Sequence, residues 1–429
     1  MSARVTRTVS SPAGRSLASS RVRGNLVPQD KGAIVLDIGH VHTKLGVSGE
    51  PAPRYIVKSE VLMKPYGEIL NVWDDKYINR EELYLILCRF LHKVFLEYLI
   101  INPREYRIVI IESIVSPLNF RNTLAKALFI HFSVPHVCFL PHPSACLFSL
   151  GSSTALLIDI GLKETSIVPV FEGVSLIRSI MQTTTSTSSL HSSLQLLLHE
   201  HCQVKNIANG DIHPLSDNKD LELTSSTLSN IIMQTCFVRS LDFGDATPPD
   251  VCFPINAQFS LIISGLVRCH VADILFEGCD GDVSLPISLV ESLLLCPIDC
   301  RSQLCENIVV VGGSASLPGL NYRLLEEIRL LCGNSRYQCL DALKFKFHEL
   351  HSHPNYTAWQ GASIIGAVES AILERSITKE DFKLLDYHLP DWMSCNSQNW
   401  GSLQQVSPQK IPSSQPGKVI QTVKSGFEQ

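Results

Sequence analysis

The chain has 429 residues, of which 45% are hydrophobic and 18% charged, and its formal net charge is −5 from 36 basic and 41 acidic side chains. This composition favours a soluble globular protein with two or more domains and sizeable cores. Because sequence-independent nucleic-acid binding needs an excess of basic side chains, we expect no nucleic-acid partner. The longest apolar runs are shorter than the ~20 residues that a membrane-spanning helix needs, so we expect no direct membrane insertion.

Fourteen cysteines are scattered along the chain, and none of them forms a CxxC pair. This spacing argues against a zinc ribbon or a thioredoxin motif. Several cysteines stand within apolar runs, which favours buried free thiols in a reducing compartment.

Both ends of the chain have the composition of unstructured tails. Residues 1–30 are rich in Arg and Ser and contain no acidic side chain before Asp30. That composition overlaps with mitochondrial transit peptides, but we interpret the segment as a disordered tail. Residues 386–429 are rich in Gln, Ser and Pro, and we expect a flexible C-terminal tail there.

One short motif occurs twice. The apolar run at residues 33–36 ends in Asp37–Gly39, and the run at residues 155–158 ends in Asp159–Gly161. After each copy come a threonine, an apolar stretch, and then a glycine and a glutamate. Each copy predicts a buried strand followed by a tight turn. The repetition suggests a duplicated α/β domain pair, with a first half at 31–155 and a second half at 156–385.

Hydrophobic periodicity predicts most of the other elements. We expect strands at residues 107–111 and 307–311, and helices at residues 81–99, 121–131, 190–201, 257–277, 320–331 and 358–374. Residues 181–230 are rich in Ser and Thr, and outside the helix at 190–201 we expect them to be irregular.

The strand at 307–311 ends in a third element, Gly312–Gly313. Two Asp-x-Gly turns and a later glycine pair differ from Rossmann and P-loop patterns and are typical of a nucleotide cleft between two related domains. The turns would direct backbone N–H groups at phosphates, and Asp37 and Asp159 would face Mg²⁺ through water. The glycine pair would let the backbone approach the nucleoside closely.

Four segments carry a resemblance to a known family. They are residues 36–54, residues 159–173, the GGSASLPG run at 312–319 and the WQGAS run at 359–363. In that order they resemble the two phosphate loops, the nucleoside loop and the WIGGS segment of actins, and the resemblance runs from about residue 33 to 375. It implies an actin-like α/β fold, of the actin, hsp70 and hexokinase superfamily, with ATP or ADP and Mg²⁺ in the cleft. The cofactor-binding residues would be Asp37, Gly39, Lys44, Asp159, Gly161, Gly312 and Gly313, with Asp37 and Asp159 on the metal.

The two turns depart from the actin pattern. Actins have Ser-Gly after the first Asp-x-Gly, where this chain has His40 and Val41. A β-branched valine does not readily adopt the positive φ that glycine allows, so the nest of amides would change. In the second turn, Gly161 is followed by Leu162 and Lys163 in place of Asp-Gly.

The residues that support hydrolysis in actins are also replaced. His142 stands where actins have the glutamine that orients the attacking water, and Ser166 stands where they have the assisting histidine. On the adenine side, Ile232 and Met233 replace a Lys-Glu pair. Hydrolysis of a phosphoanhydride depends on positioning and electrostatics. We therefore assign no catalytic residue and expect vestigial ATP binding without turnover; we interpret His142, between two prolines, as structural.

A short segment indicates a role for the protein. Only residues 55–72 separate Arg54 from Trp73–Asp75, whereas actins have a subdomain inserted there that contacts the next subunit at the pointed end. A chain without this insertion could join a filament and not extend it, which favours a capping role. Ordinary variation in loop length is the alternative.

Within the family, the chain is most similar to the actin-related proteins at the pointed end of the dynactin complex. The segments concerned are residues 101–104, 109–113, 296–299, 323–325 and 390–392. This implies a non-catalytic cytoplasmic and cytoskeletal protein that supports dynein-driven transport. Its partners would be the end of the actin-like filament and other pointed-end subunits, and indirectly dynein and cargo adaptors.

Other readings remain open. A nuclear actin-related subunit of a chromatin-remodelling complex would share the fold, and so would a weak actin-type ATPase or a sugar kinase. The histidines at 199–202 and 348–353 lack the HExxH spacing of a zinc protease, and we interpret them as exposed polar ends of elements. Ser144 and Ser166 have no flanking glycines of a nucleophile elbow.

Overall fold

The computed structural model describes residues 32–389, apart from 64–66, 74–79, 218–220, 222, 245–246 and 279–282. The expectations for the N-terminal tail, and for the C-terminal tail beyond Leu389, concern residues outside this description. Leu389 itself is buried in the core, and its N–H donates to Asn122 Oδ1 at 2.8 Å.

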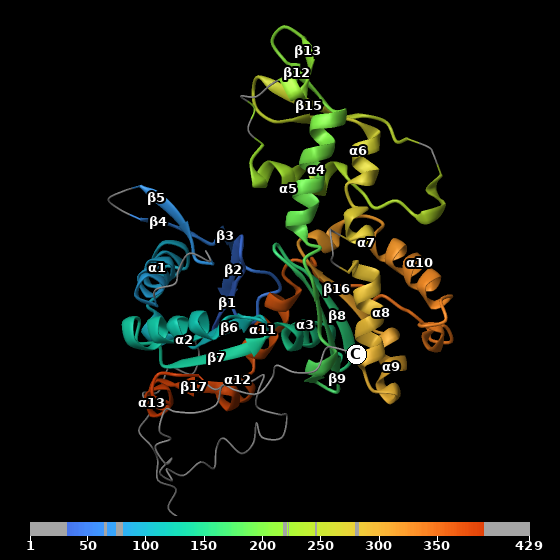
Figure 1. Ribbon diagram of the computed structural model, residues 1–429. Coiled ribbons are helices and arrows are strands. Elements are labelled where there is room, and N and C mark those ends of the chain that lie inside the picture. The colour runs from blue at the N-terminus through green and yellow to red at the C-terminus, as the bar shows by residue number, and fades with distance from the viewer. Residues whose placement is uncertain are drawn as a thin grey trace, which may run out of the picture. The chain divides into compact units, whose positions relative to one another are not determined.

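A six-stranded sheet forms the first half of the fold (Figure 1). Three central strands run parallel, and their unbroken apolar sequences suit strands that are covered on both faces. The strand order is β17-β7-β6-β1-β2-β3, and the strands are β1 (Ile34–Ile38), β2 (His42–Val47), β3 (Tyr55–Lys58), β6 (Ile108–Glu112), β7 (His136–Pro141) and β17 (Ser376–Thr378). The last of these pairs antiparallel with β7, so the chain returns to its first sheet near its C-terminal end.

The second sheet repeats the arrangement around a parallel pair, β8 and β16. Its strands are β8 (Ala155–Ile160), β9 (Thr165–Phe171), β10 (Val174–Ser175), β11 (Met181–Thr183) and β16 (Ile308–Gly312). The hairpins β1–β2 and β8–β9 have the same register after their aspartates, since Asp37 pairs with Lys44 and Asp159 with Ser166. The internal repeat in the sequence is therefore a repeat in structure.

Helices cover both sheets and divide the buried side chains into three clusters. Alternate residues of one strand enter different clusters, so Leu36 faces the helices of the first half and Val35 faces a middle layer. The main helices are α1 (Arg80–His92), α2 (Leu118–Lys126), α3 (His142–Leu150), α8 (Leu285–Leu295), α9 (Ile298–Cys305), α10 (Leu320–Cys332), α11 (Thr357–Ala367), α12 (Glu369–Arg375) and α13 (Lys379–Leu384). Helices α1 and α2 each continue into a π-helical turn, at Lys93–Tyr98 and Ala127–His131.

The middle cluster contains residues of both sheets together with α3 and α11, which pack closely against each other. Trp359 on α11 is fully buried, and its indole N–H donates to Val35 O at 3.2 Å. This bond links α11 to the first strand of the chain. The predicted helices at 81–99, 121–131, 320–331 and 358–374 are all present, the last with a break at Val368.

A four-stranded antiparallel sheet with helices α4, α5 and α6 lies within the second half, at the top of Figure 1. Its elements are α4 (Thr187–His201), β12 (Gln203–Asn206), β13 (Ile212–Pro214), α5 (Ser225–Thr235), β14 (Val251–Pro254), β15 (Phe259–Ile263) and α6 (Gly265–His270), and α7 (Ile274–Glu277) follows. The predicted helix at 190–201 is confirmed, but the irregular reading of the rest of 181–230 is wrong.

The predicted helix at 257–277 is also wrong in its first part. Phe259–Ile263 is a strand that pairs with β12 on one side and β14 on the other. Ser264 ends this strand and caps α6, because its side chain accepts a hydrogen bond from Leu266 N. A short apolar run fits a strand and a helix equally well, and the two neighbouring strands decide between them.

Residues 55–71 form β3 and a separate hairpin of β4 (Glu60–Met63) and β5 (Glu68–Asn71). Val61 is buried and belongs to the core cluster that α1 also enters. Leu62 and Ile69 are paired across the two strands, and 51% and 64% of their surfaces are exposed. The hairpin thus has one packed face and one exposed apolar pair.

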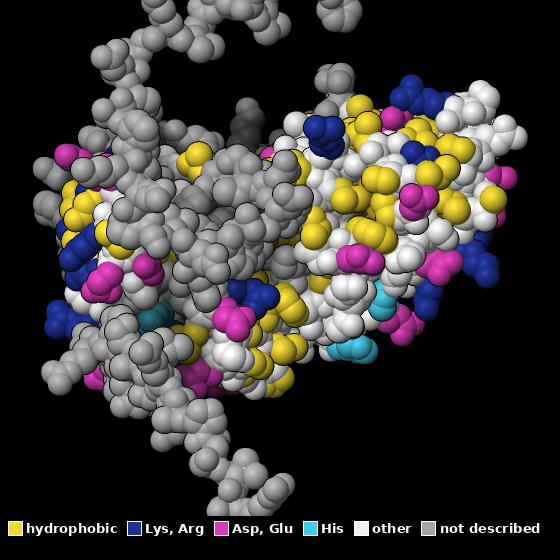
Figure 2. Space-filling view, turned by 90° about the horizontal axis from the view of Figure 1, so that it is seen from below, with side chains coloured by type: hydrophobic (Ala, Val, Ile, Leu, Met, Phe, Trp, Pro, Cys, Tyr) yellow, Lys and Arg dark blue, Asp and Glu magenta, His cyan; other side chains and the backbone are white. Residues whose placement is uncertain are grey.

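All cysteines in the described ranges are free, and only Cys252 and Cys339 among them are exposed. Within the same residues, no helix is long and apolar enough to cross a membrane. No group of three potential metal-binding side chains occurs there either. Figure 2 shows hydrophobic side chains on the face seen from below. Leu295 and Ile298, where α8 meets α9, are among the exposed hydrophobic residues.

Candidate functional site

The first Asp-x-Gly turn joins β1 to β2. Asp37 lies near the end of β1 opposite Lys44, and Lys44 Nζ is 2.8 Å from Asp37 Oδ2. Both side chains are largely buried, with 12% and 18% of their surfaces exposed. Gly39 N donates to His42 O at 3.2 Å, and a Cβ at Gly39 would lie 2.8 Å from that oxygen. The turn is therefore too tight for a side chain at this glycine.

The second turn joins β8 to β9 in the same way. Gly161 N donates to Glu164 O at 3.1 Å, and a Cβ at Gly161 would also lie 2.8 Å from the carbonyl oxygen it faces. The position opposite Asp159 holds Ser166, where the first turn has Lys44. The two turns thus have the same backbone hydrogen-bonding pattern, but the side chains opposite their aspartates differ in charge.

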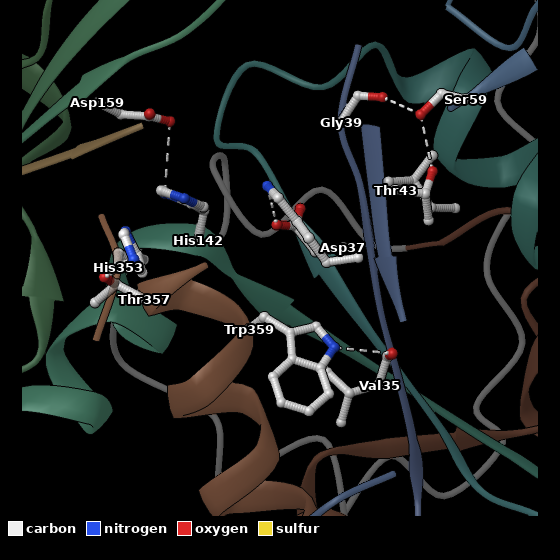
Figure 3. A network of polar contacts seen from close by, with 12 residues as sticks. Val35, Asp37, Gly39, Thr43, Ser59, His142, Asp159, His353, Thr357 and Trp359 are labelled. Carbon is white, nitrogen blue, oxygen red and sulfur yellow. Dashed lines mark hydrogen bonds and ion pairs between the residues drawn. The ribbon is translucent and has the colours of Figure 1, made fainter. Parts of the chain in front are cut away.

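His142 approaches Asp159 from the first half of the fold (Figure 3). It is the first residue of α3, directly after β7, and its Nδ1 is 3.8 Å from Asp159 Oδ2. Its Nε2 is 4.0 Å from Cys146 Sγ. Burial lowers the pKa of His142, but Cys146 and the carboxylates of Asp159 and Asp37 raise it by more, to about 10. His142 is therefore an electrostatic partner of both aspartates as well as a structural residue.

The glycine pair follows β16, next to the second turn. Gly312 has φ +102°, and a Cβ there would lie 2.3 Å from Ile160 O and 2.9 Å from Asp159 Oδ1. The backbone of Gly312 therefore lies close to the second Asp-x-Gly turn. Gly313 has φ −62°, and a Cβ there would meet no described atom within 4 Å, so its Cα faces open space.

Three side chains that the sequence did not single out for this role stabilise the first turn. They come from the 55–73 segment and donate to three successive carbonyl oxygens of the turn. Ser59 Oγ donates to Gly39 O at 2.6 Å, Asn71 Nδ2 to His40 O at 2.8 Å, and Trp73 Nε1 to Ile38 O at 3.2 Å. Trp73 also stacks on the ring of His40, with centroids 4.9 Å apart. Ser59 is fully buried and also bonds Thr43 Oγ1 at 2.8 Å.

A small cavity lies beside Asp159. Its accessible volume is about 10 Å³, close to the space of one water molecule. Its polar lining consists of Ser113, His142, Asp159 and Ser166, and the rest is apolar. Of the two residues that we expect on the adenine side, Ile232 is buried and Met233 is exposed; Ile232 has no polar side-chain atom, and Met233 has only a weakly accepting sulfur.

The donor set fits the phosphate end of a nucleotide. Asp37 and Asp159 are hard oxygen ligands that suit the water shell of Mg²⁺, and Lys44 and His142 can balance phosphate charge. At the expected adenine end, Ile232 and Met233 provide no strong hydrogen-bonding group. A bound nucleotide would supply the negative charge of its phosphates, and Mg²⁺ would partly neutralise that charge. The residues of the cleft would hold and orient the nucleotide.

Comparison with known proteins agrees with this fold. The family model described as Actin matches residues 29–383. The chain belongs to the actin family, and it has the actin-like α/β fold. Among curated relatives, actin-related protein 10 of Dictyostelium discoideum is 26% identical over 78% of this chain and 82% of its own length. The arp42 subunit of the SWI/SNF and RSC complexes of Schizosaccharomyces pombe is 24% identical over 79% of this chain and 92% of its own length.

Proposed function

We propose that this protein is a non-catalytic subunit of the dynactin complex that ends the actin-like filament at its pointed end. The observation that carries the proposal is the short segment between Arg54 and Trp73, whose described residues form β3 and a hairpin of two four-residue strands. The similarity to actin-related protein 10 supports the same reading. In the cell the protein would then lie in the cytoplasm, in a complex that serves dynein-driven microtubule transport.

The form of the hairpin supports the capping role. Its inner face is used within the chain, since Val61 packs into the core and Asn71 holds the first turn. Its outer face carries the exposed pair Leu62 and Ile69. With only 18 residues between Arg54 and Trp73, the segment has no room for the inserted subdomain of actins, and its exposed apolar pair suits contact with a different pointed-end subunit.

The lack of turnover is part of the proposal. Ser166 lies opposite Asp159, and His142 lies 3.8 Å from that carboxylate, so side chains of other types hold the two positions at which actins have their water-orienting pair. A cap that does not hydrolyse nucleotide would keep one state, which suits a permanent filament end.

Purification from native cells tests this function. The tagged full chain is recovered at low salt and its companions are identified. Recovery of actin-like filament subunits with dynein components supports the proposal. A double variant, Leu62→Glu with Ile69→Glu, should keep the filament subunits and lose other pointed-end subunits. The matched control is Leu384→Glu on α13, where 84% of the surface is exposed.

A second candidate function is a subunit of a chromatin-remodelling complex in the nucleus. The similarity to the arp42 subunit favours it. The same purification separates the two functions, because recovery of a remodelling ATPase without filament subunits would refute the dynactin proposal.

A further inference from the structure

A groove that is separate from the two Asp-x-Gly turns lies between the C-terminal end of α10 and residues 341–346. Its volume is about 610 Å³, compared with about 10 Å³ for the cavity beside Asp159. The floor of the groove is apolar, because Cys332 is buried and Leu343 and Phe345 pack partly buried against the core of the second half. The groove therefore has room for several side chains of a binding partner.

The chain beside this groove runs parallel to β16 at the end of the second sheet. A β-bridge joins Ile308 of β16 to Phe347. Ile308 N donates to Lys346 O at 2.9 Å, and His348 N donates to Ile308 O at 2.7 Å. Successive residues of a strand direct their backbone groups alternately to its two edges. The N–H and C=O groups of Phe345 and Phe347 therefore face away from β16, on a side where no described strand pairs with them.

The side chains along this open edge alternate in character. Leu343, Phe345 and Phe347 pack partly buried against the core, whereas Lys344 and Lys346 between them are exposed. Two lysines that are two positions apart in a strand lie on the same face of it. The open edge thus offers unpaired backbone groups together with a row of positive charge.

The charge of the groove indicates which partner would fit. Arg329 on α10 adds a third cation to Lys344 and Lys346, and Asp341 is the one carboxylate among the described residues that line the groove. Lysines on an open edge oppose pairing with a second copy of the same edge, because like charges would then lie opposite each other. A segment with carboxylates at alternate positions would instead be attracted.

The two ends of this chain lack the charge that such a segment needs. Residues 1–30 contain five arginines and one acidic side chain, and residues 390–429 contain three lysines and two acidic side chains. The occupant that fits the charge of the groove is therefore a segment of another protein.

We propose that the open edge at residues 343–347 binds an extended acidic segment of a partner protein. The segment would pair with the backbone of Phe345 and Phe347 as an added strand, and its carboxylates would lie beside Lys344 and Lys346. This surface shares no residue with the hairpin that we assign to the filament end. The proposal therefore holds or fails independently of the capping role.

Fluorescence polarisation with two labelled ten-residue peptides tests the charge preference. One peptide alternates Glu with Val, and the other alternates Lys with Val. At low salt, the full chain should bind the Glu–Val peptide about tenfold more tightly, because two favourable charge pairs replace two unfavourable ones. The double variant Lys344→Glu with Lys346→Glu should reverse this preference, and a reversal cannot result from a damaged fold.

The matched control is Lys205→Glu with Lys383→Glu. Both lysines are exposed and lie outside the groove, so this variant has the same change in net charge and should keep the preference of the wild type. Equal binding of the two peptides by the wild type would overturn the proposal. A preference for the Glu–Val peptide that survives in the Lys344→Glu, Lys346→Glu variant would overturn it as well.

Methylation of the peptide backbone tests strand pairing separately from charge. Two forms of the Glu–Val peptide carry N-methyl groups, one on all Glu amides and the other on all Val amides. Because an added strand presents only one of its edges to the protein, one form should lose at least about tenfold in affinity and the other should bind like the parent. Parent-like binding of both forms would refute strand addition and would instead indicate that an acidic helix or a loose charged contact suffices.

Discussion

The contact between α3 and α11 makes a strong prediction about stability. A Cβ added at Gly361 would lie 1.7 Å from Ala145 O and 2.8 Å from the carbonyl carbon of the same residue. Real Cβ atoms essentially never come within 3.0 Å of another heavy atom, so the two helices would have to separate by about 1.3 Å. The opposing atoms belong to the backbone and cannot rotate away. Gly361→Ala should therefore disturb the whole helix pair.

The expected loss of stability follows from two opposing effects. Forced expansion of a packed core costs about 1–3 kcal/mol, and a clash with backbone belongs at the upper end. Alanine in a helix interior is favoured over glycine by roughly 0.5–1 kcal/mol. The net effect is a loss of about 2 kcal/mol in the free energy of unfolding. Trp359 lies on the same helix, so its fluorescence should report the change.

Urea denaturation followed by tryptophan fluorescence and circular dichroism measures this loss. Two probes are needed because a chain with several cores can unfold in more than one step. Gly313→Ala is the control, since its Cβ would meet no described atom within 4 Å, and its stability should change by less than about 0.5 kcal/mol. If Gly361→Ala were as stable as the wild type, the inferred packing of α3 on α11 would be wrong.

Three further predictions concern buried polar groups. Ser59→Ala should cost about 1–3 kcal/mol of unfolding free energy, because Gly39 O and Thr43 Oγ1 would lose a buried partner; an unchanged urea midpoint would contradict this. Burial lowers the pKa of His191 below 6.5, so its contribution to stability is present above pH 6.5 and is lost as the pH falls toward the lowered value. In urea titrations from pH 7.5 to 5, His191→Gln should reduce the loss of stability, and an unaltered slope would refute the assignment. Burial raises the pKa of Glu291, but hydrogen bonds from Tyr337 and Arg336 lower it by more, below 4.5. The contribution of Glu291 to stability is thus present above pH 4.5 and is lost as the pH falls through the lowered pKa. Glu291→Gln should therefore flatten the dependence of stability on pH below pH 4.5. A dependence like that of the wild type would argue against these hydrogen bonds.

The central strands could be predicted because their environment leaves a plain signal. Strands β1, β8 and β16 are covered on both faces, so each is an unbroken apolar run that ends in Asp-x-Gly or Gly-Gly. The helices α1 and α10 have the apolar spacing of a helix with one buried face. In contrast, β12 and β13 are short, and most of their side chains are exposed, so nothing in their composition marks them as strands.

The site could be predicted in part for a related reason. The pairing of Asp37 with Lys44 follows from the hairpin, because a tight turn fixes the register of the residues on either side. The approach of His142 to Asp159 depends on the packing of one half of the fold against the other, and no local pattern encodes that distance. Gly312 was expected near a nucleoside, whereas its nearest neighbours in the structure are atoms of the second turn.

The support of the first turn explains how His40 and Val41 can occur there. Ile38 O, Gly39 O and His40 O each accept a hydrogen bond from a side chain of the segment that follows β3. These bonds hold the turn from outside, so its shape does not depend on a glycine after His40. A side chain that bonds a backbone carbonyl leaves no periodic trace in the sequence, which is why this support could be found only in the structure. The short 55–73 segment is thus part of the cleft as well as of the surface that we assign to the filament end.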